Sequence, residues 1–180
     1  MSSIRRRALD AAITLVGTEG VRALTHGRVD AAASLPPGST SNHFRTRAAL
    51  LAGVIEWIAT AERAEGGFPG TIDTAEGLVA MLQHALELES GSGATRTRAR
   101  YALFLEALDE EAAAPLREQR RIFEEWTRAT LMRIGGAEAA AGTRMLMATC
   151  DGLLLHRVTV DPDAPMDDAI RRAVNAAIGA

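Results

Sequence analysis

Residues 24–51 decide the fold of this chain, and they read LTHGRVDAAASLPPGSTSNHFRTRAALL. The apolar run that follows Leu24 and Thr25 predicts the start of a short helix. The segment 35–38, Leu-Pro-Pro-Gly, cannot continue that helix, because proline lacks an amide hydrogen and crowds the preceding turn. The small polar residues 39–43 then predict a second short helix. Two short helices joined in this way are typical of a helix-turn-helix, whose second helix enters the major groove of DNA.

Outside this stretch, apolar residues recur at helical spacing, and no segment alternates as a strand does. The sequence therefore predicts an all-α fold of about nine helices, with a three-helix helix-turn-helix head and a helical-bundle body. Gly17 to Gly20 are expected to end the first helix, and Thr46 to cap the helix after the head. We expect the head to span residues 1–46 and the body residues 47–180. The other expected helices cover residues 4–16, 46–61, 74–89, 95–113, 115–134, 138–159 and 165–178.

Composition limits where the chain works. Charges interrupt every apolar run, so no segment has the length of a membrane span. The arginines at positions 5–7 resemble the start of an export signal, but no apolar stretch follows them. A single cysteine, Cys150, excludes an internal disulfide and fits a reducing compartment. We therefore expect a cytoplasmic protein with no membrane partner.

The net charge of −3 conceals an uneven distribution. Residues 1–50 carry seven arginines against three acidic residues, a net charge of +4, whereas residues 51–180 carry 13 arginines against 20 acidic residues, a net charge of −7. A basic end on an acidic body is what a nucleic-acid contact confined to one end requires. A chance local excess would give the same count, so charge alone leaves both interpretations open.

The first fifty residues resemble the head of a TetR-family transcriptional regulator. The family pattern is roughly an apolar first helix ending in Gly, then Thr, Ile-Ala, Ala-Gly-Val-Ser, Gly-Thr-Leu-Tyr, His-Phe, a Lys, and Leu-Leu. The resemblance implies an all-helical ligand-binding and dimerisation body, to which Asp151 to His156 also conform. The residues that match the head without a gap are Gly20, Thr25, Val29, Ala33, Leu35, Gly38, Ser39, His43, Phe44, Arg47, Leu50 and Leu51.

Three positions depart from the pattern. Ser34 stands in place of the turn glycine, and Ser41 in place of the usual tyrosine of the recognition helix. Pro36 replaces the serine that caps this helix, so Pro37 is expected to set the start of the helix instead. The lost tyrosine hydroxyl would normally reach a phosphate, so the contacts with DNA are expected to differ in part from those of the family.

The resemblance also assigns residues to DNA. The start of the second short helix would lie nearest the bases, where an asparagine can pair with adenine and threonine or proline can contact a thymine methyl group. Arg5 to Arg7 could reach the backbone as an arm. An ordinary solvent-facing turn is the alternative for the polar residues. The residues expected near bases are Pro37, Gly38, Ser39, Thr40 and Asn42, and those expected at phosphates are Thr25, His43 and Arg47.

The body is expected to hold a small-molecule effector in an apolar pocket. Large apolar residues at helical spacing also pack a core, and this alternative stays open for each candidate. Four scattered histidines and one cysteine lack metal-ligand spacing, so neither a metal nor another cofactor is expected. Cys150 is expected in the core, with redox sensing as the alternative. The candidate pocket residues are Met81, His84, Tyr101, Phe104, Leu105 and Trp126.

Taken together, the sequence predicts a ligand-responsive repressor that binds a palindromic DNA operator as a homodimer, with the last two long helices as the dimer interface. One alternative is a helical adaptor that binds proteins and retains a degenerate DNA-binding head, which the loss of tyrosine at Ser41 keeps open. Another is a small all-helical enzyme. Against the enzyme, no nucleophile stands near a base, and residues 109–111, Asp-Glu-Glu, are typical of a solvated helix end.

Overall fold

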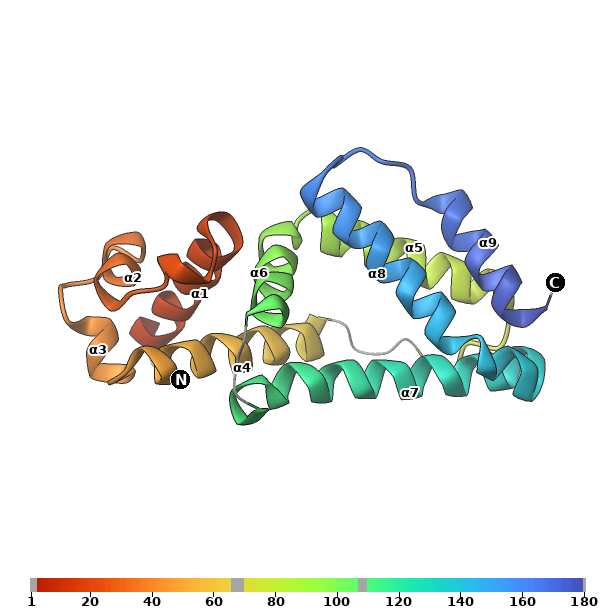
Figure 1. Cartoon of the computed structure of the whole chain (residues 1–180), viewed down its shortest axis with the longest axis horizontal. Coiled ribbons are helices and arrows are strands. Elements are labelled where there is room, and N and C mark those ends of the chain that lie inside the picture. The colour runs from red at the N-terminus through yellow and green to blue at the C-terminus, as the bar shows by residue number, and fades with distance from the viewer. Residues whose placement is uncertain (1–2, 66–69, 107–109, 180) are drawn as a thin grey trace. The chain divides into compact units, whose positions relative to one another are not determined.

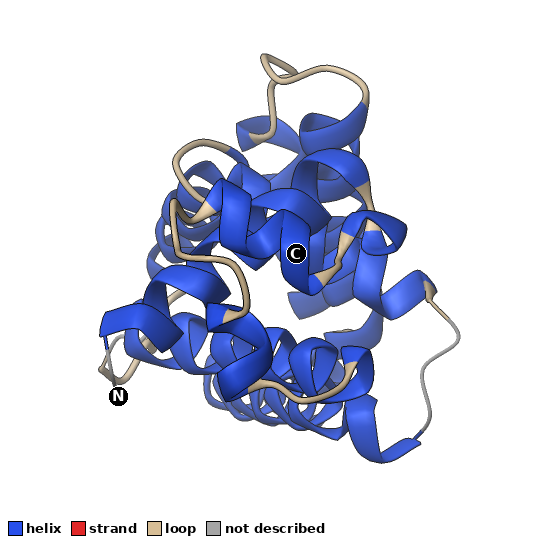
Figure 2. Ribbon diagram, turned by 90° about the vertical axis from the view of Figure 1, so that its left-hand side faces the viewer, coloured by secondary structure: helices blue, strands red, loops and turns tan. Residues whose placement is uncertain are grey.

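A computed structural model describes residues 3–65, 70–106 and 110–179 of the chain. All regular structure in these residues is helical, and Figure 2 accordingly shows blue helices and tan loops, which confirms the predicted all-α class. One short 3-10 turn, Val21–Ala23, accompanies nine α-helices in the described part. The α-helices are α1 (Ser3–Glu19), α2 (His26–Ala32), α3 (Ser39–His43), α4 (Arg47–Glu65), α5 (Ala75–Ser90), α6 (Ala94–Leu105), α7 (Glu110–Ala141), α8 (Thr143–Thr159) and α9 (Asp167–Ile178).

The chain divides into two compact units. Met1–Glu65 and Thr95–Glu118 form the N-terminal unit, and Gly66–Ala94 and Gln119–Ala180 form the C-terminal unit. Each unit has its own cluster of buried apolar side chains. The sequence pattern placed a functional boundary after residue 46, whereas α4 and α6 pack with the helices of the N-terminal unit.

The N-terminal unit is built around α1, which contacts α2, α3 and α4. The apolar stripe of α1 faces inward because its apolar residues recur every three or four positions. Gly17 lies within α1 and does not end it: a Cβ at this position would lie 2.2 Å from the carbonyl oxygen of Thr95, so α1 approaches α6 at a distance that only glycine allows. Fully buried members of this core include Leu9, Val16, Leu24, Val29, Leu50, Ile55 and Leu103.

In the C-terminal unit, α5, α8 and α9 pack against one another, and Figure 1 shows them side by side. Thr74 caps α5 through the Gly77 amide, as the predicted start at residue 74 requires. A Cβ on Gly142, just before α8, would lie 2.8 Å from Cα of Ala177, so the last two helices also meet closely there. Cys150 is buried in this core, as expected. Other members of the core are Leu78, Leu82, Leu131, Leu146, Ile170 and Val174.

Three predicted helix boundaries were wrong. The helix expected over residues 95–113 ends at Leu105, and the next one begins at Glu110, so Pro115 lies inside α7 and does not open it. Pro115 removes one backbone hydrogen bond near the start of α7 without ending the helix. The glycine pair at 135 and 136 does interrupt α7, with a φ of 73° at Gly136, but α8 begins five residues later than predicted.

None of the helices in the described part of the chain combines the length and apolar content that a membrane crossing requires.

Candidate nucleic-acid interface

The predicted helix-turn-helix is present as α2, a turn and α3. The hydroxyl of Thr25 caps α2 by accepting the Arg28 amide at 3.4 Å. After α2, Ser34 takes up left-handed backbone geometry with a φ of 51°, at the position where the family pattern has glycine. Gly38, with a φ of 88°, then precedes the first helical residue of α3. Pro37 therefore does not set the start of α3 as expected, because the chain passes through a left-handed glycine first.

Asp30 of α2 organises the start of α3. One carboxylate oxygen accepts the Gly38 amide at 2.8 Å, and the other accepts the Thr40 amide at 2.8 Å and the Thr40 hydroxyl at 2.5 Å. Burial raises the pKa of Asp30, but the hydrogen bonds from Thr40 and Gly38 and the nearby His26 outweigh it, so the pKa lies below its ordinary value. The carboxylate is 4% exposed and stays ionised. Asp30 lies outside the sequence motif, so the motif gave no sign of this role.

Two further side chains tie the head together. The ring Nε2 of His26 donates to the carbonyl oxygen of Phe44, 2.6 Å away, immediately after α3. Arg7 of α1 donates to the carbonyl oxygens of Ala33 and Ser34 at 2.6 and 3.1 Å. Arg7 thus caps the C-terminus of α2, where a cation also suits the helix dipole.

The residues expected near bases separate into exposed and buried ones. Pro37, Gly38 and Asn42 are exposed, and Ser39 is half-buried. Within the described part of the chain no hydrogen bond engages the side-chain amide of Asn42, whereas Ser39 Oγ donates to the carbonyl oxygen of Pro36. Thr40 has no exposed surface, because its hydroxyl is bound to Asp30. Thr40 therefore supports the turn from inside and cannot reach a base.

The residues expected at phosphates all lie at the surface of the head. Thr25, His43 and Arg47 are exposed, and Arg47 also donates to the carbonyl oxygen of Val21 at 2.9 Å. Within the N-terminal arginine run, Arg7 is used to cap α2 and Arg5 lies over the ring of Phe44 at 5.3 Å.

The basic surface of the head also includes exposed arginines that are not part of the sequence motif. No hydrogen bond or ion pair among the described residues involves the side chains of Arg6, Arg22 or Arg45. Arg45 directly follows α3 and its C-cap Phe44, a place suited to a phosphate contact. In the sequence, the one sign of a phosphate contact at Arg45 is its position next to the recognition helix.

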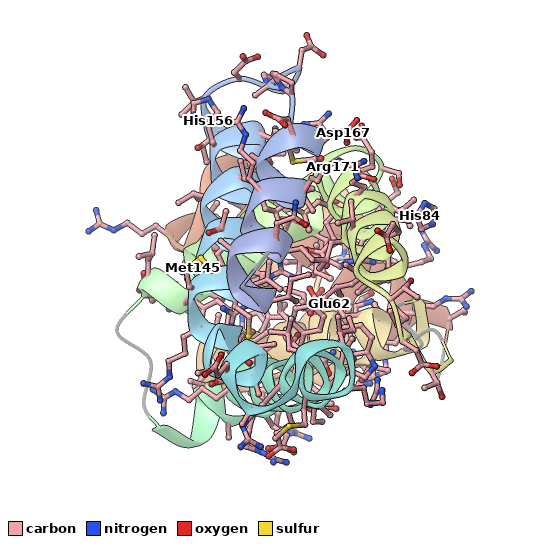
Figure 3. All side chains as sticks on the ribbon, turned by 90° about the vertical axis from the view of Figure 1, so that its right-hand side faces the viewer. Glu62, His84, Met145, His156, Asp167 and Arg171 are labelled. Carbon is pink, nitrogen blue, oxygen red and sulfur yellow. The ribbon has the colours of Figure 1, made fainter. Side chains whose placement is uncertain are left out.

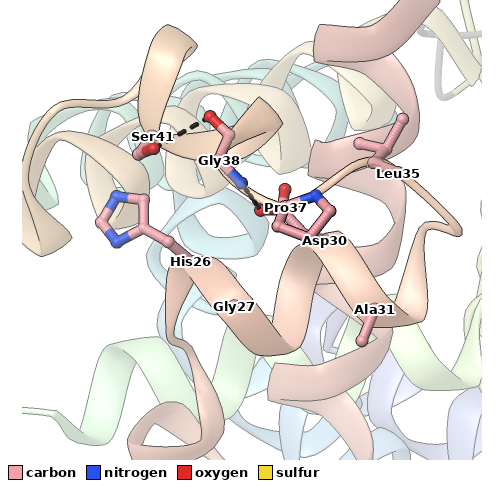
Figure 4. Close-up of a pocket in the computed structure, with 8 residues that line it drawn as sticks. All are labelled: His26, Gly27, Asp30, Ala31, Leu35, Pro37, Gly38 and Ser41. Atoms are coloured by element: carbon pink, nitrogen blue, oxygen red, sulfur yellow. Dashed lines mark hydrogen bonds between the residues drawn. The ribbon is translucent and has the colours of Figure 1, made fainter.

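A shallow hollow of about 370 Å³ opens between α2 and α3. Its wall includes Ser41, whose hydroxyl donates to the carbonyl oxygen of Gly38 at 2.9 Å, and Asp30 (Figure 4). A tyrosine at position 41 would add a ring beside this space, so the departure from the family pattern leaves the surface open here. The other lining residues are His26, Gly27, Ala31, Leu35, Pro37 and Gly38.

The six expected pocket residues fall in different units. Tyr101, Phe104 and Leu105 belong to the N-terminal unit, where Leu105 is 85% exposed. Met81 and Trp126 pack against the core of the C-terminal unit, and Trp126 stacks on Phe123 with 6.0 Å between ring centroids. His84 is exposed on α5 (Figure 3). Neither unit by itself gathers all six, and no group of acidic, histidine or cysteine side chains among the described residues could hold a metal ion.

Comparison with known proteins places this architecture. Residues 69–180 match the family model described as "Tetracyclin repressor-like, C-terminal domain". A TetR-family member from Streptomyces coelicolor A3 is 27% identical, with 98% of this chain and 99% of that chain covered and a TM-score of 0.72. The multidrug binding protein EbrR, solved with ethidium, is 28% identical over 98% of this chain and 99% of that chain, with a TM-score of 0.67.

A transcriptional regulator from Rhodococcus sp. Rha1 is 22% identical over 99% of this chain and 95% of that chain, and its TM-score of 0.80 shows a likeness in fold alone. No match was found among curated proteins.

The chain is all-helical, carries a helix-turn-helix head and matches these proteins over nearly its whole length. These features are those of a helix-turn-helix transcriptional regulator. The chain belongs to the tetracyclin repressor-like (TetR) family. Members of this family are regulators and not enzymes, so the enzyme alternative is excluded.

Proposed function

We propose that the protein is a repressor that binds a palindromic operator as a homodimer and releases it when a small molecule binds the body. The observation that carries the proposal is the outer surface of α3. Asn42 is exposed on α3, Pro37 is exposed just before this helix and Arg45 just after it, on a head whose first fifty residues have a net charge of +4. Polar groups for base edges and cations for phosphates thus occur on one short segment. We propose residues 1–46 as the part that reads DNA.

The second support is the outer face of α8. Five exposed residues follow one another at alternating spacings of three and four, which is the spacing of a helix–helix seam. Met145 and Leu155 are 42% and 41% exposed, and Met145 projects from α8 in Figure 3. The small residues between them permit close approach of a second helix. The seam consists of Met145, Ala148, Gly152, Leu155 and Thr159.

We propose that a second copy of the chain covers this seam, so that two heads are held at the separation of two half-sites. The exposed residues of α9 are mainly charged, among them Asp167 and Arg171 in Figure 3, and would form the polar margin of the same interface.

The effector site is proposed on α7. Gln119, Phe123 and Trp126 are four and three residues apart, so they share one face of the helix. The Gln119 side-chain oxygen is buried and has no hydrogen-bond partner among the described residues. A ligand that donates a hydrogen bond would satisfy it. EbrR binds ethidium, and a planar aromatic compound of that kind would extend the stacked rings of Phe123 and Trp126.

Met81, packed against the same core, could border such a ligand on α5, and His84 stays a candidate only for the exposed rim. Tyr101, Phe104 and Leu105 lie on α6 in the N-terminal unit and are not part of this proposed site.

DNA binding is tested with a duplex selected by the wild-type chain from a random-sequence pool. Asn42→Ala should weaken binding by about ten- to a hundredfold, as expected for loss of one bidentate base contact. The control is Thr71→Ala, which removes an exposed polar side chain outside the head and outside α8 and α9, and should leave the affinity unchanged. If the wild-type chain enriches no sequence from the pool, the DNA-binding proposal is wrong and the adaptor alternative gains support.

Ligand binding is tested by the fluorescence of Trp126 in a Trp57→Phe background, with ethidium and proflavin as probes. Saturable quenching that is weakened by Gln119→Leu supports a site on α7. Release of the selected duplex at saturating probe supports induction. An unchanged operator affinity under saturating probe would contradict the induction mechanism for this class of compound.

A further inference from the structure

The short helix α3 is held at both ends by two side chains of α2. Asp30 receives the amides of Gly38 and Thr40 at the start of α3, and His26 donates to the carbonyl oxygen of Phe44 at its end. The two α2 residues are four positions apart and so lie on one face of that helix. A helix of five residues cannot maintain itself in isolation, so these contacts decide where α3 lies.

The Asp30 carboxylate acts as the N-terminal cap of α3. Pro36 has no side-chain acceptor at the position of the family's capping serine, and Gly38, the residue that precedes α3, has no side chain to offer. The carboxylate reaches across from α2 and accepts the amides that a local cap would otherwise accept. Its negative charge at the start of α3 and the histidine at the end also match the two poles of the helix dipole.

Because the Asp30 carboxylate is buried, it needs hydrogen bonds from the protein in place of those from water. Asp30 is 4% exposed, and an ionised group taken from water is stable only when its hydrogen bonds are complete. Both oxygens are engaged, one by Gly38 and the other by the amide and hydroxyl of Thr40. Few positions of α3 satisfy all three bonds together, so the charge specifies one placement of the helix.

We propose that Asp30, assisted by His26, is the positioning residue that fixes α3 on the head and thereby places Asn42 and its neighbours for reading DNA. Asp30 itself is buried beneath α3 and acts through that helix. The contacts of Asp30 and His26 with the two ends of α3 are called the α3 clamp below. The consequence for DNA affinity rests on the proposed function, whereas the clamp itself can be measured in the free protein.

The clamp is tested by amide hydrogen exchange on the full-length free chain. Asp30→Ala should speed exchange of the Gly38 and Thr40 amides by at least about tenfold, as expected for lost hydrogen bonds to a charged acceptor. Thr40→Val keeps the volume and removes one donor, so it should give a smaller effect and keep the head folded. The control Asp10→Asn alters a carboxylate that accepts the Trp57 ring N–H at 2.7 Å and should leave these amides unchanged.

Rescue separates positioning from general loss of structure. Adding Pro36→Ser to Asp30→Ala restores a local cap and should slow exchange at Gly38 again. On the selected duplex, Asp30→Ala should lose at least about tenfold in affinity, and the double variant should recover most of it. Undiminished protection in both Asp30→Ala and Thr40→Val would overturn the clamp. Restored protection without restored affinity would overturn the positioning role. Amides that respond as stated in a chain that selects no duplex would support the clamp and overturn the DNA-binding proposal.

Discussion

Gly17→Ala is predicted to destabilise the N-terminal unit, although alanine normally favours a helix over glycine by about 1 kcal/mol. The added Cβ would lie 2.2 Å from the carbonyl oxygen of Thr95, whereas an ordinary carbon–oxygen contact is about 3.3 Å or longer. The oxygen is part of the main chain and cannot rotate away, so α1 and α6 must separate by about 1 Å. Overpacking of this kind costs about 1–3 kcal/mol. Subtracting the helix-propensity gain of alanine leaves an expected net loss of up to about 2 kcal/mol.

The assay is urea unfolding followed by Trp57 fluorescence in a Trp126→Phe background, where the expected loss lowers the midpoint by up to about 1 M. Two alanine controls give the scale. Gly27→Ala meets nothing within 4 Å and should stabilise by about 0.5 kcal/mol. Gly53→Ala meets an aromatic ring at 2.5 Å, which can tilt, so its effect should fall between the other two. A Gly17→Ala variant as stable as Gly27→Ala would refute the reasoning.

Four further predictions follow from single contacts. The pKa of Asp30 in the folded chain lies below its ordinary value of 3.8, so the carboxylate stabilises the fold fully above pH 3.8 and loses this effect as the pH falls through the folded pKa. The free energy of unfolding, measured as a function of acid pH, should therefore fall more steeply in the wild type than in Asp30→Asn. Ser34→Gly relieves the left-handed backbone and should raise the free energy of unfolding by roughly 1 kcal/mol, provided the turn is unchanged. Burial, with Asp151 adding to it, raises the pKa of Cys150 to about 11, so alkylation at pH 8 should be far slower in the folded chain than in urea; equal rates would restore the redox-sensing alternative. Glu62→Ala breaks the 2.7 Å ion pair with Arg100, in which both side chains are under 15% exposed, and should lower the free energy of unfolding by about 3 kcal/mol in urea unfolding. The control Glu125→Ala breaks the exposed pair with Arg121 and should change the free energy of unfolding very little.

Features set by neighbouring residues could be predicted from the sequence. Thr25 and Thr74 each accept an amide three residues ahead, and Thr46 does the same for Ala49 at 3.1 Å. A cap needs only the local chain, so its residue type and the apolar stripe behind it are sufficient evidence. The helix-turn-helix was recognisable for the same reason.

Features set by distant partners could not be predicted. Gly17 has the residue type of a helix end, but its role is a close approach to Thr95, 78 positions away. Asp30 has the residue type of a surface acid, and only the fold brings the Gly38 and Thr40 amides to it. Thr40 was expected at the DNA for its polarity and is buried by that same contact.

The candidate ligand residues illustrate a further limit. Apolar residues at helical spacing, such as Met81 and Trp126, pack the core and could equally border a ligand, because both roles need the same side chains. The side-chain oxygen of Gln119 is buried and has no hydrogen-bond partner in the described part of the chain, and nothing in the sequence pattern indicates this.

The central claim is that two heads of one dimer read two half-sites, and a footprint combined with a salt titration on the selected duplex tests it most directly. The account predicts two protected half-sites with centres about one helical turn or a multiple apart, two chains per duplex, and a logarithm of the association constant that falls linearly with the logarithm of salt concentration. Leu155→Arg on the α8 seam should abolish the paired protection while the head stays folded. A single protected site occupied by one chain, or equal protection of a scrambled duplex, would contradict the account.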